Sequence, residues 1–348
     1  YIYFSAKWTK EQEAGAKKYS ATSKANTALV MMLPYTEILD FKDFRLQFLK
    51  AVYFFKFCES NEHFKEYLEV FLKARGVKSW NEYLINLVSV YIFLLQKDSV
   101  KSVLVFDEKS KNVFQSLENL CIDINSFTAS KDFLTIRPKP IYRYSDNELQ
   151  FLNINFLIDK IYQGIIFDFA DILIQNSVTF KGKPITKRQQ FFGIFGDEFI
   201  ETHLFYEVMK HVFSHKDYLH YTGDELKARF GEGTPDYLII HKRKVYVFEF
   251  KNTIFNGNVK YAFDIEQIKQ ELDTKFVQNA AGSPKGVTQL VNFIADFAQG
   301  RYDEILPHEK TSYIIYPSLV TTDYTFNLPV IYSFILNRFK EILRNNPD

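Results

Sequence analysis

Apolar residues at three- and four-residue spacing dominate the first part of the chain and predict helices there. The stretches 37–58 and 63–76 both have this spacing, and Gly76 suits the end of a helix. A third predicted helix begins after Ser79, which is placed as an N-cap, and contains the apolar run 83–96. That run is shorter than the roughly 20 residues of a membrane span, so we interpret it as a buried helix.

The pattern then changes twice and suggests a division of the chain. Short β-prone runs at 132–153 flank the turn-like sequence SDNE, and 154–175 returns to helical spacing. A polar, basic stretch at 176–190 follows and is the candidate boundary. We therefore predict a mainly α-helical N-terminal domain with a small β element at 1–180, and a second domain at 181–348.

Helical and strand-like segments alternate in the last part of the chain. A helix is expected at about 191–213 and a closing helix at VIYSFILNRFKEILR, with further helices at 264–278 and 286–299. Strands are expected near 218–221, 236–241 and 244–250, and in KTSYIIYPSLV. This order predicts a mixed α/β (α+β) layered unit.

Composition narrows the class of protein without naming a function. The 348 residues are 47% hydrophobic and carry a net charge of +1, so overall charge does not argue for nucleic-acid binding. Cys58 and Cys121 form no CxxC pair, which suits a reducing compartment and argues against a cysteine-based zinc site. The start of the sequence has no sustained apolar core, so we expect a cytoplasmic protein without membrane association.

Three charged residues occupy positions in predicted strands at which buried apolar side chains are normally found. Asp236 opens one strand, and Glu249 and Lys251 lie inside the next. A buried charge is costly unless it is paired or binds a metal. Glu249 and Lys251 share one face of their strand because side chains alternate, and the aromatic residues Tyr246, Phe248 and Phe250 take the other. A short turn at His241–Lys244 would place Asp236 beside them.

This trio has a chemical use at a phosphate. Mg²⁺ prefers oxygen ligands, and Asp236 and Glu249 could supply two carboxylates, with the backbone carbonyl of Phe250 as a third oxygen. Mn²⁺ is expected to substitute. Such a metal activates water and stabilises charge on a leaving oxygen. Lys251 would orient or help deprotonate the attacking water, or stabilise the pentacovalent phosphate.

The same residues resemble a known family. Pro235 and Asp236, followed after a gap of 12 residues by Glu249, Phe250 and Lys251, resemble the motif of the PD-(D/E)xK nuclease superfamily. The resemblance covers roughly 191–320 and implies a restriction-endonuclease-like α/β/α core. It also implies a Mg²⁺-dependent endonuclease that cleaves DNA. By analogy, such a protein is a component of a restriction or anti-phage defence system.

The resemblance further implies contributions from two helices. The helix before the first strand usually offers a glutamate to the metal; Glu198 and Glu201 share a helical face, and we favour Glu201. The helix after the lysine strand often carries a glutamine or lysine, here Gln289 or, less favoured, Lys285. The long segment 252–283 departs from the family pattern and separates these two from the strand.

Candidate contacts to nucleic acid are basic residues near the motif. They are Lys183, Lys187 and Arg188 before the first helix of this part, Lys242 and Arg243 in the turn, and Lys285. By this placement the turn lies at the far end of the strands from the acid pair. No GxxxxGK[ST] sequence exists, so a partner NTPase would come from another chain, and an oligomer is compatible with the pattern.

Alternatives to this interpretation remain open at the sequence level. The charged trio could be a structural ion-pair cluster or a solvated strand end. The chain could be a non-catalytic module that binds nucleic acid or protein and keeps the nuclease fold. A member that cleaves RNA is a further variant.

Overall fold

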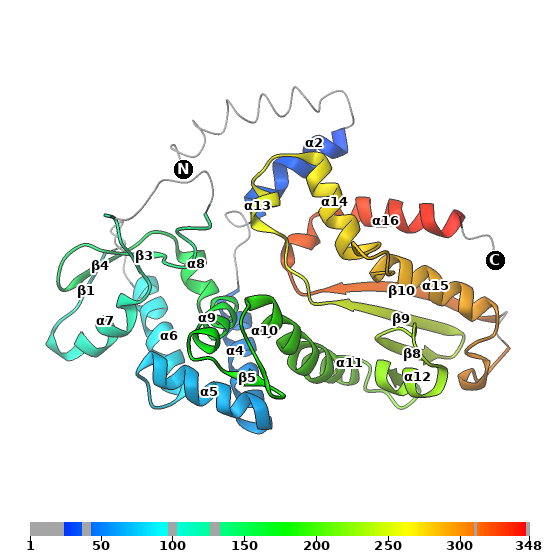
Figure 1. Cartoon of the computed structure of the whole chain (residues 1–348), viewed down its shortest axis with the longest axis horizontal. Coiled ribbons are helices and arrows are strands. Elements are labelled where there is room, and N and C mark those ends of the chain that lie inside the picture. Colours follow the sequence, from blue (N-terminus) through cyan, green and yellow to red (C-terminus); the bar gives the residue numbers. More distant parts are fainter. Residues whose placement is uncertain (1–23, 37–42, 97–102, 126–132, 310–311, 346–348) are drawn as a thin grey trace. The chain divides into compact units, whose positions relative to one another are not determined.

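The computed structural model of the protein describes residues 24–36, 43–96, 103–125, 133–309 and 312–345. These form two units, Glu37–Phe199 and the combination of Tyr1–Thr36 with Ile200–Asp348, which we call the helical unit and the sheet unit (Figure 1). The fold is mixed α and β, as expected. The sequence pattern places the division after residue 180, whereas contacts place it after Phe199 and assign the described residues 24–36 to the sheet unit.

The helical unit consists mainly of helices, together with a small sheet and a hairpin. Its helices are α4 (Phe44–Ser60), α5 (Glu62–Arg75), α6 (Trp80–Gln96), η2 (Glu108–Ser110), α7 (Lys111–Glu118), α8 (Ile154–Asp159), α9 (Gln163–Gln175) and α10 (Arg188–Phe195). Its strands are β1 (Val103–Val105), β2 (Cys121–Ile122), β3 (Ile141–Arg143), β4 (Glu148–Phe151), β5 (Thr179–Phe180) and β6 (Lys183–Pro184). The larger sheet has the order β1-β4-β3-β2, and β5 and β6 form a separate hairpin.

Local chemistry explains the helix boundaries that the pattern predicted. Ser79 Oγ accepts a hydrogen bond from the N–H of Glu82 at the start of α6, which confirms it as an N-cap. Gly76 ends α5 with a φ of 66°, a left-handed conformation that favours glycine. The SDNE turn joins β3 and β4 as an antiparallel hairpin. The predicted helix at 154–175 is wrong in one respect, because α8 and α9 are separate helices.

Phenylalanine side chains form the centre of the helical unit. The Phe54 side chain is fully buried, and its ring meets those of Phe169, Phe195 and Phe199 at centroid distances of 5.2, 5.5 and 5.2 Å. These contacts have edge-to-face geometry, the arrangement that the ring quadrupoles favour. Helices α4, α9 and α10 are therefore joined through one aromatic residue.

The sheet unit is a four-stranded sheet with helices around it. Its strands are β7 (Leu219–Thr222), β8 (Tyr237–His241), β9 (Lys244–Lys251) and β10 (Ile314–Thr321). Its helices are α2 (Lys24–Met32), η1 (Leu33–Tyr35), α11 (Tyr206–Val212), α12 (Gly223–Phe230), α13 (Gly257–Lys260), α14 (Ile265–Phe276), α15 (Gly286–Ala298), η4 (Asp303–Ile305), η6 (Tyr324–Asn327) and α16 (Pro329–Arg344). The strand order is β10-β9-β8-β7, with β9 antiparallel to β8 and parallel to β10.

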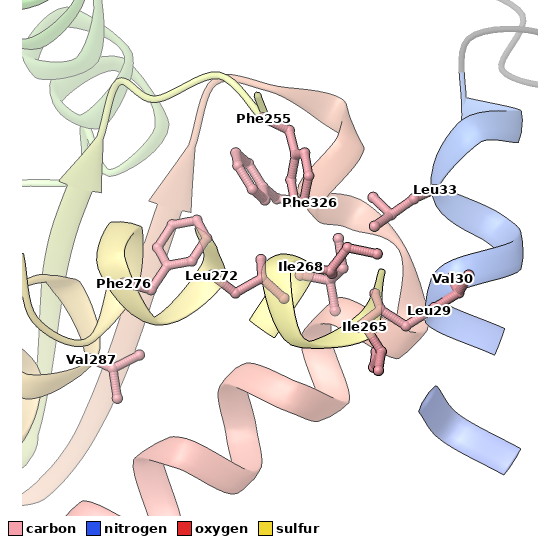
Figure 2. Close-up of a cluster of buried hydrophobic side chains, with 11 residues drawn as sticks. Leu29, Val30, Leu33, Phe255, Ile265, Ile268, Leu272, Phe276, Val287 and Phe326 are labelled. Atoms are coloured by element: carbon pink, nitrogen blue, oxygen red, sulfur yellow. The ribbon is translucent and has the colours of Figure 1, made fainter. Parts of the chain in front are cut away.

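Two apolar clusters hold the helices of the sheet unit. Figure 2 shows the first, in which Leu29 and Leu33 from the α2–η1 segment meet Ile265, Ile268 and other residues of α14. The second packs α15 on the sheet through Leu290. Helix α2 therefore belongs to the core of the sheet unit, although it comes first among the described helices.

A π-helix connects α10 to α11. The predicted helix at about 191–213 corresponds to α10, the π-helix η3 (Gly196–Phe205) and α11 in succession. π-helices have i→i+5 hydrogen bonds and occur frequently at functional sites. Among the described residues, no helix has both the length and the apolar character needed to cross a membrane.

Replacing Phe54 with alanine tests the aromatic centre of the helical unit. Phe54→Ala should lower the free energy of unfolding by about 3–5 kcal/mol, because a fully buried ring leaves a cavity. Phe48→Ala on the same helix α4 is the control, since Phe48 is 36% exposed, and should cost less, about 1–2 kcal/mol. Urea unfolding of both variants measures the difference, and equal losses would contradict the described packing.

Candidate active site

The pairing of β8 with β9 brings Asp236 to Glu249 and Lys251. The last register pair is Tyr237 with Phe248, so the next residue, Asp236, lies beside Glu249. The backbone N–H of Phe250 donates to Asp236 Oδ2 at 2.7 Å. The hairpin and the proximity of the three charged residues are thus confirmed.

Lys251 connects the two carboxylates. Its Nζ atom donates to Glu249 Oε2 at 2.9 Å and reaches Asp236 Oδ2 at 3.5 Å. The Lys251 side chain is 17% exposed, that of Asp236 21% and that of Glu249 1%. The trio is therefore an ion-pair cluster that is closed on the Glu249 side and open to solvent at Asp236.

The two faces of β9 pack as the alternation predicts. Val245 and Val247, on the same face as Glu249, are buried in the cluster that includes Leu290 of α15. On the other face, the ring of Phe250 stacks on Phe205 at 4.8 Å. Apolar packing on both sides fixes the strand that carries the charges.

Burial sets the protonation of Glu249. Desolvation, and then the negative charge of Asp236, raises the pKa of Glu249 to about 8 even though Lys251 opposes the shift. For Lys251, burial disfavours the charge, but Glu249 and Asp236 together outweigh it and raise the pKa. Lys251 is thus protonated at neutral pH, and Glu249 holds a proton until a further cation replaces it.

Helix α15 begins directly beside Lys251. A Cβ atom built on Gly286, its first residue, would lie 3.7 Å from Lys251 Cε and 2.8 Å from Leu319 Cδ1, so a glycine permits this close approach. Gln289 lies one turn further along α15, and its Oε1 atom is buried without a hydrogen-bond partner among the described residues. Buried polar atoms normally have partners, so this oxygen has capacity for a ligand or water.

Contacts to its backbone also hold Asp236 in place, and the sequence pattern does not predict these contacts. The N–H of Gly223 donates to the Asp236 carbonyl at 2.9 Å, and a Cβ atom on Gly223 would lie 3.1 Å from that oxygen. The Tyr206 hydroxyl lies 3.3 Å from the same Cβ position. Burial and then the charges of Glu201, Asp224 and Asp236 raise the pKa of Tyr206.

The two candidate glutamates of the first helix lie in different units. Glu201 belongs to the sheet unit, and its charge acts with that of Asp236 on Tyr206. Glu198 belongs to the helical unit, where its carboxylate lies 3.7 Å from Lys181 Nζ. The expectation that the two share a face assumed α-helical geometry, but both lie in η3, whose turn is wider.

The donor set for a metal has two close carboxylates. In the part of the chain that the structure describes, no group of three or more His, Cys, Asp or Glu side chains is arranged to hold a metal ion. The backbone N–H of Phe250 contacts Asp236, whereas the role predicted for its carbonyl stays a prediction. The Asp236–Glu249 pair is therefore the centre of any cation site here.

The basic residues proposed to contact nucleic acid occupy separate places. Lys242 and Arg243 are exposed in the turn at the opposite end of β8 and β9 from Asp236, as predicted. Lys285 is the half-buried N-cap residue of α15 in the sheet unit. In the helical unit, Lys183 and Lys187 are exposed, while Arg188 forms two hydrogen bonds with Asp171.

Comparisons with known proteins found no match. No family model matches the sequence, and no curated protein or solved structure matches the chain. The geometry of the site is therefore the evidence on function.

The raised pKa of Glu249 predicts a pH-dependent stability in metal-free buffer. Between its unfolded pKa near 4.5 and its folded pKa of about 8, only the folded state keeps the proton. This contribution is full below pH 4.5, and it should fall by about 1.4 kcal/mol per pH unit until pH 8. Urea unfolding of wild type and Glu249→Gln from pH 5 to pH 8 should show this slope in wild type relative to the variant. A constant difference between them would contradict the assignment.

Proposed function

We propose that the chain is a metal-dependent phosphodiesterase, an endonuclease of the PD-(D/E)xK type that acts on DNA. The observation that carries the proposal is the contact of Lys251 Nζ with both Asp236 and Glu249 at one end of a strand pair. A structural ion pair needs one carboxylate per lysine, whereas this arrangement places two carboxylates at one ammonium. When both carboxylates are ionised, one negative charge is left unbalanced by Lys251, and a cation would balance it.

The arrangement of the sheet unit supports the resemblance. Helix α11 precedes the strands and α15 follows the lysine strand, as the resemblance implies. Phe213 after α11 contacts Phe248 at 6.3 Å on one face of β9, and Leu290 of α15 packs on the other. We infer an α/β/α core of the restriction-endonuclease-like kind from these two helical layers.

The residues present fit a hard divalent cation such as Mg²⁺. Asp236 and Glu249 would hold it, because both carboxylates lie at Lys251, and burial keeps Glu249 protonated unless a positive charge is added to that of Lys251. Glu201 is the candidate for a further ligand, since its charge reaches Tyr206 beside Asp236. When bound, such a cation lowers the pKa of a coordinated water and stabilises charge on phosphate oxygens.

The raised pKa of Lys251 narrows its role. A lysine that keeps its proton at neutral pH is a poor general base, so Lys251 acts as a donor and a positive charge. Its ammonium would donate to a non-bridging phosphate oxygen, where negative charge increases as water attacks phosphorus. Fixed donors of this kind act most strongly in partly desolvated sites. The Gly223 and Phe250 backbone contacts hold Asp236 in place during this step.

Plasmid cleavage with Mg²⁺ or Mn²⁺ tests the proposed activity. Asp236→Ala and Lys251→Ala should each lower the rate by roughly 100-fold or more, because they remove a cation ligand and the phosphate donor. Glu304→Ala and Lys340→Ala are matched controls at exposed positions of the sheet unit and should cleave like wild type. Equal rates for all five proteins would refute the assignment. Absence of Mn²⁺ binding by calorimetry would favour a non-catalytic binding module.

Gln289→Met separates a role in the site from a role in folding. Removing an unpartnered buried oxygen avoids a penalty of about 1–3 kcal/mol, so the free energy of unfolding should stay level or rise. The cleavage rate should nevertheless fall by about tenfold, because the oxygen that faces a water or ligand is lost. Gln299→Met, at the exposed end of α15, is the control. An unchanged rate in Gln289→Met would exclude Gln289 from the site.

A further inference from the structure

The helical unit contains a cavity of about 220 Å³ that the proposed nuclease activity does not use. Its floor is one face of α9, where Gln163, Gly164, Phe167, Asp168 and Asp171 recur at the spacing of a single helical stripe. The opposite face of α9 is buried in the aromatic core. This helix therefore separates an apolar interior from a polar cavity.

Charged side chains line the cavity, and two of them are unusually buried. Asp159 is 4% exposed and Lys160 5% exposed, and both lie at the end of α8. Arg137 Nε lies 3.3 Å from Asp159 Oδ2. Residues of these types are almost never fully buried unless paired, and burying them costs several kcal/mol per ion. A buried group of ion pairs is weak evidence that these residues stabilise the fold. We therefore consider a functional role for them.

Among the described residues, the ion-pair network around the cavity has one more positive charge than negative charges. Asp168 serves two cations at once, Arg75 at 2.8 Å and Lys160 at 3.3 Å. Arg188 at the rim pairs with Asp171 at 2.5 Å. Four described cations, Arg75, Arg137, Lys160 and Arg188, are thus linked to the three carboxylates Asp159, Asp168 and Asp171. Arg75 contacts Asp168 without lining the cavity, and the lining itself has three cations and three carboxylates.

Hydrogen-bond donors without partners also indicate that this region could bind a negatively charged group. A lysine ammonium has three donors, and among the described residues Lys160 has one hydrogen-bond partner, Asp168. The Nε atom of Arg75 is buried without a partner. Gly164 leaves the space that the Lys160 stem occupies, since a Cβ atom there would lie 2.7 Å from Lys160 Cδ. Lys160 therefore has donors that the described residues leave without an acceptor.

We propose that this cavity binds a small phosphorylated ligand of mononucleotide size. Its phosphate would accept hydrogen bonds from Lys160 inside and Arg188 at the rim, and its hydroxyl groups would donate to the carboxylates of the wall. A base would lie against the apolar part of the lining around the half-buried Phe167 ring, beside the Arg188 guanidinium, which lies 5.8 Å from the ring centroid. A volume below the roughly 300–1,000 Å³ of common ligand sites excludes an oligonucleotide.

Calorimetry on the full chain in EDTA tests this site separately from the carboxylate site. The probes are the four ribonucleoside monophosphates and ribose 5-phosphate, with adenosine and inorganic phosphate as fragments. At least one probe should bind one to one with a dissociation constant below about 1 mM, more tightly than either fragment. Lys160→Met and Arg188→Gln should each weaken binding by about tenfold or more, because each removes a charged donor.

Two matched variants decide which site is responsible. Lys187→Gln removes a neighbouring exposed charge that does not line the cavity, and Asp236→Ala alters the other unit; both should bind like wild type. Arg188 is half exposed, so Arg188→Gln decides the question if Lys160→Met does not fold. Binding of no probe, or undiminished binding by the cavity variants that fold, would overturn the proposal.

Discussion

The buried carboxylate of Glu249 is the constraint on which the rest of the site depends. It lies beside a second carboxylate, Asp236, and the single ammonium of Lys251 contacts both. Without a second positive charge, Glu249 is held protonated, with a pKa of about 8. An acid therefore occupies a buried position at which an apolar side chain would make the fold more stable. We infer that the acid is present for a functional reason.

The fold holds these charges together through backbone pairing and packing on two faces. Hairpin register places Asp236 next to Glu249, and the Phe250 N–H fixes the Asp236 carboxylate. Phe205 covers one face of β9 while the α15 cluster covers the other. The hairpin register and the Phe250 N–H keep the Asp236 carboxylate near Glu249, so a proton on Glu249 relieves the repulsion between the two acids in the absence of a metal. A bound cation relieves it instead.

The position of the charged trio can be predicted from the local sequence pattern. Other features of the site cannot be predicted in this way. Strand alternation and the short turn suffice to bring Glu249, Lys251 and Asp236 together, since both depend on neighbours in the sequence. The π-helix, the contact of Tyr206 with the Gly223 position and the approach of Gly286 to Lys251 depend on tertiary packing, which periodicity does not encode. The cavity of the helical unit was missed for the same reason, because its charges come from separate segments.

Diffraction from a crystal soaked in Mn²⁺ tests the central claim most directly. We expect one anomalous peak within about 2.5 Å of oxygens from both Asp236 and Glu249, with Lys251 Nζ moved away from the Glu249 carboxylate. A third ligand would be recognised at the same time, and Glu201 is the residue expected. A map with no anomalous peak, in which Lys251 still contacts both carboxylates, would contradict the account.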